Sequence, residues 1–253
     1  MAAWFVQVRP NHQGVAEDVE ALQELGIQVN TFEVEPFTNT VSIDRGLVGG
    51  IVRGSVQAIG GLRGLPGVFL RSDAANSCET WVRGNGDAML NAGGFTTTWR
   101  DLMYRRDGRA VHVRPLVDLK AFAGTVVKDC DFEGTFAHLE RRGYRPRMDQ
   151  RVFVSEYKPI VDEFRVAVVY DYAFGRQTRS RQNLVPGGAF MSTSLVEQCM
   201  ALIRQAPHEV YVADFARLAS GELKIVEFNC FNCSGWSGHN LLDMYYYLNQ
   251  VTR

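Results

Sequence analysis

Long apolar runs and an excess of one charge are both absent from this sequence of 253 residues. Without a run of about 18 apolar residues, no segment is expected to form a membrane-spanning helix. The opening residues, MAAWFVQVRP, lack the charged start and long apolar stretch of a signal peptide and predict a strand. The formal net charge is −1, so no strong overall field attracts nucleic acid or an anionic membrane, although a local basic patch is left open.

Cysteine and histidine are few, which removes several common kinds of site. The five cysteines are an odd and scattered set, so no disulfide framework is expected and the simplest compartment is a reducing cytoplasm. The five histidines accompany no serine or cysteine nucleophile signature, so a hydrolytic triad has no support. Cys230 and Cys233 could form a zinc site with His239, but no second C-x-x-C pair occurs. We therefore expect these cysteines to be small residues that line a substrate pocket.

What the sequence does contain is an ordinary globular composition, with 46% hydrophobic and 22% charged residues, enough for one large or two compact domains. Apolar spacing predicts a strand at residues 4–8, a helix at 14–25 that ends at Gly26, and a second strand at 27–34. Weaker strands are expected at 50–53 and 68–70. This β–α–β opening predicts a small α/β lobe.

Strand signals dominate the second half of the chain. Strands are expected at residues 110–114, 125–128, 151–154 and 163–170, with a strand pair within 210–229. Helices are expected at residues 132–142 and 192–206, and the aromatic run at 245–247 is expected to pack into the core from a helix. No internal repeat or low-complexity segment interrupts this pattern. The chain is therefore predicted to be a mixed α/β (α+β) protein.

The most informative segment is YVADFARLASGELKIVEFN, residues 211–229, which has two strand-like runs around Ser220–Gly221. If those two residues form the hairpin loop, Asp214 lies opposite Glu227, and the two side chains are about 5 Å apart on one face. Asn229, two residues further, is on the same face. The hairpin therefore predicts a cluster of three oxygen-bearing side chains.

Two facing carboxylates repel each other, and a hard divalent cation relieves that repulsion. Aspartate, glutamate and an amide oxygen are ligand types that Mg²⁺ accepts. The alternative is a hairpin with one solvent-facing polar side. The apolar Ile225, expected on the same face as Glu227, makes a fully wet face less natural.

Three segments in this order resemble the ATP-grasp superfamily, especially the clade around the ribosomal-protein glutamate ligases. The first, VADFAR followed by GELKIVEFNCFNCSG, resembles the strand with an aspartate and the E-x-N strand of that family. The resemblance implies that Asp214, Glu227 and Asn229 hold the Mg²⁺ ions that bridge the phosphates of ATP.

The second segment, VDEFRVAVV at residues 161–169, resembles the acidic-x-Arg strand of the family. Glu163 and Arg165 alternate onto one face, and the planar guanidinium suits phosphate or carboxylate oxygens. A purely structural salt bridge is the alternative. The third segment, RQNLVPGG at residues 181–188, resembles R-x-N-x-x-x-G-G, which implies that Arg181 and Asn183 lie near the γ-phosphate and the acyl phosphate. An ordinary loop is the alternative there.

Two further segments complete the resemblance. VHVRPLVDLKAFAG, residues 111–124, resembles the strand and loop that cover the phosphates and implies roles for Arg114 and Lys120. It departs from the common pattern, because Arg–Pro replaces Lys–Pro and the loop is poor in glycine. This is typical of a divergent branch, the R-2-K type, whose examples are frequent in phages and bacteria. VFVSEYK, residues 152–158, resembles the hinge that binds adenine through backbone groups, which implies nucleotide contacts at Val154, Glu156 and Tyr157. Glu163 is assigned to the same nucleotide site.

The resemblance implies an ATP-grasp fold in which antiparallel sheets grip the nucleotide, with residues 1–105 as a preceding α/β lobe and 106–253 as the catalytic region. It implies an ATP-dependent carboxylate–amine ligase that uses Mg²⁺ and forms an acyl phosphate, with small-molecule or peptide substrates. A kinase acting on a hydroxyl and a non-catalytic nucleotide-binding module are the alternatives. The acid, the amine and the oligomeric state, including a homodimer, are left open.

Overall fold

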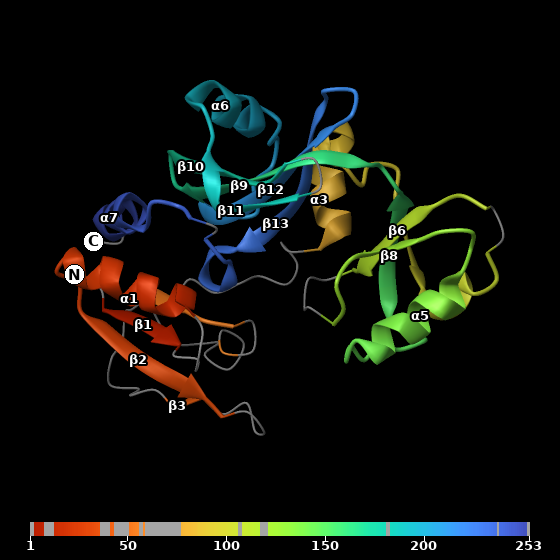
Figure 1. Cartoon of the computed structure of the whole chain (residues 1–253), viewed down its shortest axis with the longest axis horizontal. Coiled ribbons are helices and arrows are strands. Elements are labelled where there is room, and N and C mark those ends of the chain that lie inside the picture. Colours follow the sequence, from red (N-terminus) through yellow and green to blue (C-terminus); the bar gives the residue numbers. More distant parts are fainter. Residues whose placement is uncertain are drawn as a thin grey trace.

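The computed structural model describes residues 3–7, 13–35, 41–42, 51–55, 58, 77–105, 108–116, 121–180, 183–236 and 238–251. These residues form a four-stranded N-terminal sheet, a five-stranded central sheet and a second four-stranded sheet, here called the third sheet. Figure 1 shows the central sheet between the other two. The expected strand at 68–70 lies outside the described residues.

The N-terminal lobe confirms the predicted β–α–β opening. Its elements are β1 (Trp4–Gln7), α1 (Gln13–Glu24), β2 (Val29–Val34), β3 (Val41–Ser42) and β4 (Ile51–Arg53), in the sheet order β3-β2-β1-β4. β1 is parallel to both β2 and β4. Gly26 ends α1 as expected, because its φ of 67° is open to glycine at little cost.

The central sheet is antiparallel throughout, with the order β11-β10-β9-β12-β13. Its strands are β9 (Ile160–Val169), β10 (Tyr172–Ser180), β11 (Asn183–Phe190), β12 (Val210–Leu218) and β13 (Leu223–Cys230). One face packs under α3 (Cys78–Asn85) and α6 (Thr193–Ala201), around Trp81, Phe164 and Phe228. The expected helix at 192–206 is too long, because the Asn85 side chain accepts the backbone N–H groups of Arg204 and Gln205 and ends the helical run.

The other face of the central sheet is divided between two neighbours. At one end it packs against the N-terminal lobe and α7 (Leu241–Val251), in a core that includes Trp4, Val212 and Tyr245. Tyr245 confirms the expected core position, whereas Tyr246 is half exposed. At its other end this face looks toward the third sheet.

A buried polar cluster joins the N-terminal lobe to the segment that follows β13. Arg53 pairs with Asp18 at 3.2 Å and donates to the carbonyl oxygens of Phe231 at 2.6 Å and Ser234 at 3.0 Å. The Trp236 indole donates to Asp18 at 2.8 Å and lies 4.2 Å from the Arg53 guanidinium. This cluster, the lobe junction, is almost closed to solvent.

The third sheet has the order β5-β8-β6-β7 and is antiparallel. Its elements are β5 (Phe95–Thr98), α4 (Trp99–Leu102), β6 (Val111–Pro115), β7 (Thr125–Val127), α5 (Phe132–Arg141) and β8 (Arg151–Glu156). The helices cover one face around Trp99 and Val113. Because β5 pairs with β8, this sheet includes residues on both sides of residue 105. The two short 3-10 turns are η1 (Gly86–Ala88) and η2 (Phe231–Cys233).

Candidate active site

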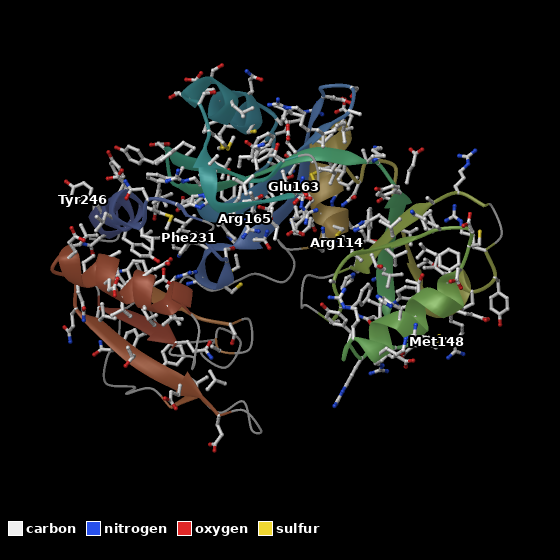
Figure 2. The ribbon with its side chains drawn as sticks, in the orientation of Figure 1. Arg114, Met148, Glu163, Arg165, Phe231 and Tyr246 are labelled. Carbon is white, nitrogen blue, oxygen red and sulfur yellow. The ribbon has the colours of Figure 1, made fainter. Side chains whose placement is uncertain are left out.

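A cavity of about 520 Å³ lies between the central sheet and the third sheet. Figure 2 shows Arg114, Glu163 and Arg165 gathered in this region. Lining residues from the central sheet include Glu163, Arg165, Asp214 and Glu227, and those from the third sheet and its loops include His112, Arg114, Phe122, Gly124 and Tyr144. Charged side chains of both signs therefore meet in one cleft from segments that are far apart in the sequence.

The predicted opposition of Asp214 and Glu227 is confirmed, since these residues are direct partners across β12 and β13. The route to that register differs from the prediction. The Leu218 N–H bonds to the carbonyl of Glu222, so the loop has three residues rather than two, and Gly221 there has a φ of 87°. A bulge at Val226 compensates for the extra loop residue.

The same bulge corrects the expectation for Ile225. This side chain is fully buried in the core beneath α3 and α6, on the face opposite Glu227. Val226, the extra residue of the bulge, lines the cavity instead. An apolar residue therefore does adjoin the carboxylates, as expected, but it is Val226 and not Ile225.

Hydrogen bonds draw the three oxygen-bearing side chains together. Asn229 Nδ2 donates to Asp214 Oδ2 and to Glu227 Oε1, each at 3.0 Å. Arg165 donates from Nε and Nη2 to the two oxygens of Asp214, both at 2.7 Å, and Arg114 Nη2 donates to Glu227 Oε2 at 2.6 Å. Each carboxylate thus has its own arginine, and the amide connects the two.

The electrostatics of the pair are uneven. Burial and the nearby negative charge of Glu227 raise the pKa of Asp214 to about 6, in spite of the Arg165 guanidinium. Burial also acts to raise the pKa of Glu227, but Arg114, the Asn229 hydrogen bond and Arg165 outweigh it and lower that pKa to about 2. Glu227 is therefore ionised at every ordinary pH, and Asp214 is the group that gains a proton in mild acid.

The donor set fits a hard divalent cation. Within the described ranges no three His, Cys, Asp or Glu side chains are close enough to hold a metal, so the candidate depends on two carboxylates and one amide. If the Asn229 amide is turned over, its oxygen takes the place of Nδ2, beside an oxygen of each carboxylate. Three oxygens around one point are the donors that Mg²⁺ accepts.

The acidic-x-Arg strand has the predicted alternation. Glu163 and Arg165 face the cavity, while Phe164, Val166 and Val168 are in the opposite core. Glu163 Oε1 accepts from Arg179 at 3.3 Å. Arg165 donates its remaining Nη1 to the carbonyl of Gly235 at 3.0 Å, so the segment after β13 helps to hold it.

Other predicted site residues lie away from this cluster or outside the description. Val154 is fully buried in the core between the third sheet and α5, Glu156 is exposed, and Tyr157 donates its backbone N–H to Ala110. None of these three lines the cavity. Asn183 is exposed at the start of the edge strand β11. Lys120 and Arg181 are outside the described residues.

The sequence reasoning missed His112 and Tyr144, which both line the cavity. His112 precedes Arg114 by two residues on β6, so strand alternation could have placed it on the same face. Burial and the charge of Arg114 lower the pKa of His112 to about 4, so the ring is neutral at pH 7. Tyr144 follows α5 and carries no sequence signal that distinguishes it.

Cys230 and Cys233, which were expected to line a substrate pocket, are not among the residues that line this cavity. Cys230 Sγ contacts Asn232 Oδ1 at 3.3 Å and Cys233 Sγ contacts the Cys230 carbonyl at 3.7 Å. They lie next to the lobe junction, and they form no zinc site with other side chains in the described part of the chain. Among the described helices, none is long and apolar enough to cross a bilayer.

Comparisons with known proteins give one consistent result. The family model for the ATP-grasp domain, R-2-K clade family 2, matches residues 94–247. A search of curated proteins found no match.

Three solved structures illustrate the likeness in fold. The D-cycloserine synthetase DcsG has a TM-score of 0.64 and 13% identity, over 99% of this chain and 100% of that one. The macrocyclase MdnC from Microcystis aeruginosa, bound with precursor peptide MdnA, has a TM-score of 0.62 and 12% identity, over 100% and 99%. The ATP-grasp ligase PsnB, complexed with minimal precursor, Mg and ADP, has a TM-score of 0.60 and 15% identity, over 100% and 98%. These matches confirm the predicted ATP-grasp fold.

Proposed function

This chain belongs to family 2 of the R-2-K clade of ATP-grasp domains, and from that premise we propose that it is an ATP-dependent carboxylate–amine ligase. In the proposed reaction, a substrate carboxylate attacks the γ-phosphate of ATP, giving an acyl phosphate and ADP. An amine then displaces phosphate and forms an amide. The observation that carries the proposal is the pair Asp214 and Glu227, directly opposed, bridged by Asn229 and open to the cavity.

Asp214, Glu227 and Asn229 would hold Mg²⁺, whose chemical contribution is to neutralise phosphate charge. The chain's own part is positioning, since phosphoryl transfer to a carboxylate needs little covalent help from a protein. The two side chains of the Arg165–Asp214 pair are 22% and 17% exposed, so each can exchange partners with a ligand. The same holds for Glu227, which is 25% exposed.

Arg114 and Arg165 would turn from carboxylate to phosphate. A cation bound by the carboxylates competes with the guanidinium groups for the same oxygens, and planar guanidinium groups suit phosphate equally well. Glu163 is assigned to the nucleotide site because it lines the cavity beside Arg165. Arg181 and Asn183 are proposed to contact the acyl phosphate, and Lys120 to close over the phosphates, on the resemblance alone.

The adenine hinge is proposed at Val154, Glu156 and Tyr157, through backbone groups and not side chains. This part of the proposal depends on the resemblance, because these residues lie outside the cavity lining. The amine and acid are proposed to be small molecules or peptide groups, as the solved relatives include a D-cycloserine synthetase and enzymes bound to precursor peptides. A reducing, cytoplasmic setting is proposed because all five cysteines, each in the described part of the chain, lack a disulfide.

The test is a phosphate-release screen with Mg–ATP and pairs of candidate acids and amines. A ligase releases phosphate only when both partners are present, whereas a kinase consumes ATP with one substrate and releases no phosphate. The double variant Asp214→Asn with Glu227→Gln removes both proposed carboxylate ligands and tests the metal assignment. Turnover or Mg–ATP binding that survives this double change would remove the metal assignment.

A further inference from the structure

One row of side chains crosses the central sheet on the face that carries the site. Direct strand partners run from Glu227 through Asp214, Arg165 and Arg176 to Phe190. Directly opposed residues share a face, so Arg176 is on the same side as Arg165. At the usual strand spacing, the Arg176 backbone is about 10 Å from that of Asp214. The row therefore continues beyond the proposed metal site.

Arg176 differs from every other charged member of that row. It is 6% exposed, and its guanidinium lies 3.2 Å from the ring centroid of Phe190. In the described ranges it has no salt bridge and no hydrogen bond, whereas Arg165 is bound to Asp214 and Gly235. Burial lowers the pKa of Arg176, and no carboxylate offsets that effect. An unpaired buried cation is costly, and a ligand anion would offset the cost.

His239 supplies a second unsatisfied group, near the β9 and β10 backbone at Arg165 and Phe174. The ring is 6% exposed, and the charges of Arg165 and Arg176 both act on it. Its Nδ1 is hydrogen-bonded with the carbonyl of Trp236, which requires the proton on Nδ1. Burial and the charges of Arg165 and Arg176 lower the pKa of His239 to about 4 and outweigh the opposite effect of backbone groups of Arg165 and Phe174 near the ring. The ring is therefore neutral at pH 7, and with the proton on Nδ1 the Nε2 atom is an acceptor. Nε2 is buried and has no hydrogen-bond partner within the described chain.

We propose that Arg176 and His239 form a substrate subsite that binds a carboxylate group with a neighbouring N–H donor. The carboxylate would pair with the Arg176 guanidinium, and the N–H would donate to His239 Nε2. An α-amino acid carries both groups, and so does the C-terminal residue of a peptide. Phe190 would cover the ion pair between the substrate carboxylate and Arg176. Arg165 would lie between this subsite and the phosphates.

This inference deepens the proposed function and rests on it only for the identity of the subsite as a substrate site. The first measurement is calorimetric binding of Mg–ADP to the whole chain, which tests the nucleotide site alone. The second is binding of each of the twenty common amino acids in the presence of Mg–ADP. At least one amino acid should bind saturably, and its carboxamide derivative, which lacks the carboxylate, should bind at least about 10-fold more weakly.

The variant Arg176→Met keeps the length of the side chain and removes its charge. We expect it to weaken amino-acid binding by about 10- to 100-fold and to leave Mg–ADP binding unchanged. Its stability to urea should be no lower than that of the wild type, because an unpaired buried charge is replaced by an apolar group. Arg204→Met is the matched control, since Arg204 is exposed and pairs with Asp87 at the far side of the sheet; it should leave both affinities unchanged.

Several results would overturn the subsite. The first is a wild-type chain that binds Mg–ADP but binds no amino acid. The second is an Arg176→Met variant with the same amino-acid affinity as the wild type. The third is a loss of stability in that variant, which would indicate that Arg176 has a structural partner. If Mg–ADP fails to bind but amino-acid binding depends on Arg176, the subsite stands and the proposed ligase falls. Equal binding of an N-acetyl amino acid supports a peptide terminus as the source of the carboxylate, and weaker binding supports a free amino acid.

Discussion

Two arginine–aspartate pairs in this chain have the same chemistry and opposite surroundings. Arg165–Asp214 faces a cavity, and Asp214 also faces Glu227, a second carboxylate. Arg53–Asp18, in the lobe junction, has side chains only 7% and 6% exposed and is enclosed by Trp236 and by backbone carbonyls. Burial and pairing therefore do not identify a site by themselves. What distinguishes the site pair is an open side and a second carboxylate, Glu227, directly opposite Asp214.

The largest expected effect comes from Asp18→Asn, which breaks the enclosed pair. The change removes the partner of a buried cation, and such changes cost about 3–5 kcal/mol of unfolding free energy. Urea unfolding measures the loss. Mg–ADP binding, measured below the unfolding transition, should stay within about threefold of wild type. A variant as stable as the wild type would show that the junction does not hold the lobes together.

The same substitution in the site, Asp214→Asn, should have the reverse profile. Removal of a ligand to the proposed cation should weaken Mg–ADP binding by more than about 100-fold. This is more than the loss caused by removing a residue that only hydrogen-bonds to a ligand. The unfolding free energy should change by less than about 1 kcal/mol, because the pair with Arg165 is partly solvated and one carboxylate repulsion is removed. Calorimetry and urea unfolding on one preparation give both numbers. A large loss of both Mg–ADP affinity and unfolding free energy in Asp214→Asn would contradict the proposed difference between the two aspartates.

The sequence predicted the opposed carboxylates because strand alternation and a turn signal are both local properties. It did not predict the three-residue loop or the bulge at Val226. These two features shift the strand register by one residue in opposite directions, so the pairing of Asp214 with Glu227 is the same as predicted. The ion pair of Arg114 with Glu227 joins residues 113 positions apart. Only the family resemblance connected these segments, because local patterns carry no information about which sheets face each other.

Other differences also have a tertiary cause. The helix expected at 192–206 stops at Ala201, since a side chain on α3 takes backbone groups that would otherwise extend it. Tyr144 reaches the cavity from a loop whose path the sequence does not specify. The strands that carry the two carboxylates could thus be predicted, and the opposite wall of the cleft could not.

A smaller effect should appear with pH. The pKa of Asp214 is raised to about 6, so a proton competes with the cation below that pH. The affinity for Mg²⁺ alone should fall by about tenfold per pH unit below pH 6. Stability should move the other way: the folded chain binds this proton more readily than the unfolded chain, so the contribution of Asp214 to unfolding free energy rises as the pH falls from about 6 toward the unfolded value of about 4.

Calorimetric titrations with Mg²⁺ between pH 5 and pH 7.5 measure this dependence. Asp18→Asn should retain it, and Asp214→Asn should lose it. An affinity that stays constant over this range would show that Asp214 is not a ligand, or that its pKa is not raised.

The smallest expected effect is that of Gly124→Ala on the wall formed by the third sheet. A Cβ at this position would lie 2.7 Å from His112 Nε2, so the loop or the ring must shift. The resulting overpacking should weaken Mg–ADP binding by about fivefold, or about 1 kcal/mol. The double variant Gly124→Ala with His112→Ala should recover most of the loss, as expected for residues in direct contact. No recovery would mean that the glycine acts through its backbone.

The bulge at Val226 also has a consequence for tolerance to change. The third residue of the hairpin loop shifts the pairing by one position, and the bulge shifts it back before the strand reaches Glu227. Suppose that one residue of the loop is deleted and the residue that follows the loop takes its place. If the bulge is lost at the same time, Asp214 and Glu227 stay opposite each other and the site is unchanged. The same deletion with the bulge retained would instead put Phe228 opposite Asp214, and an aromatic ring would replace a carboxylate in the cleft.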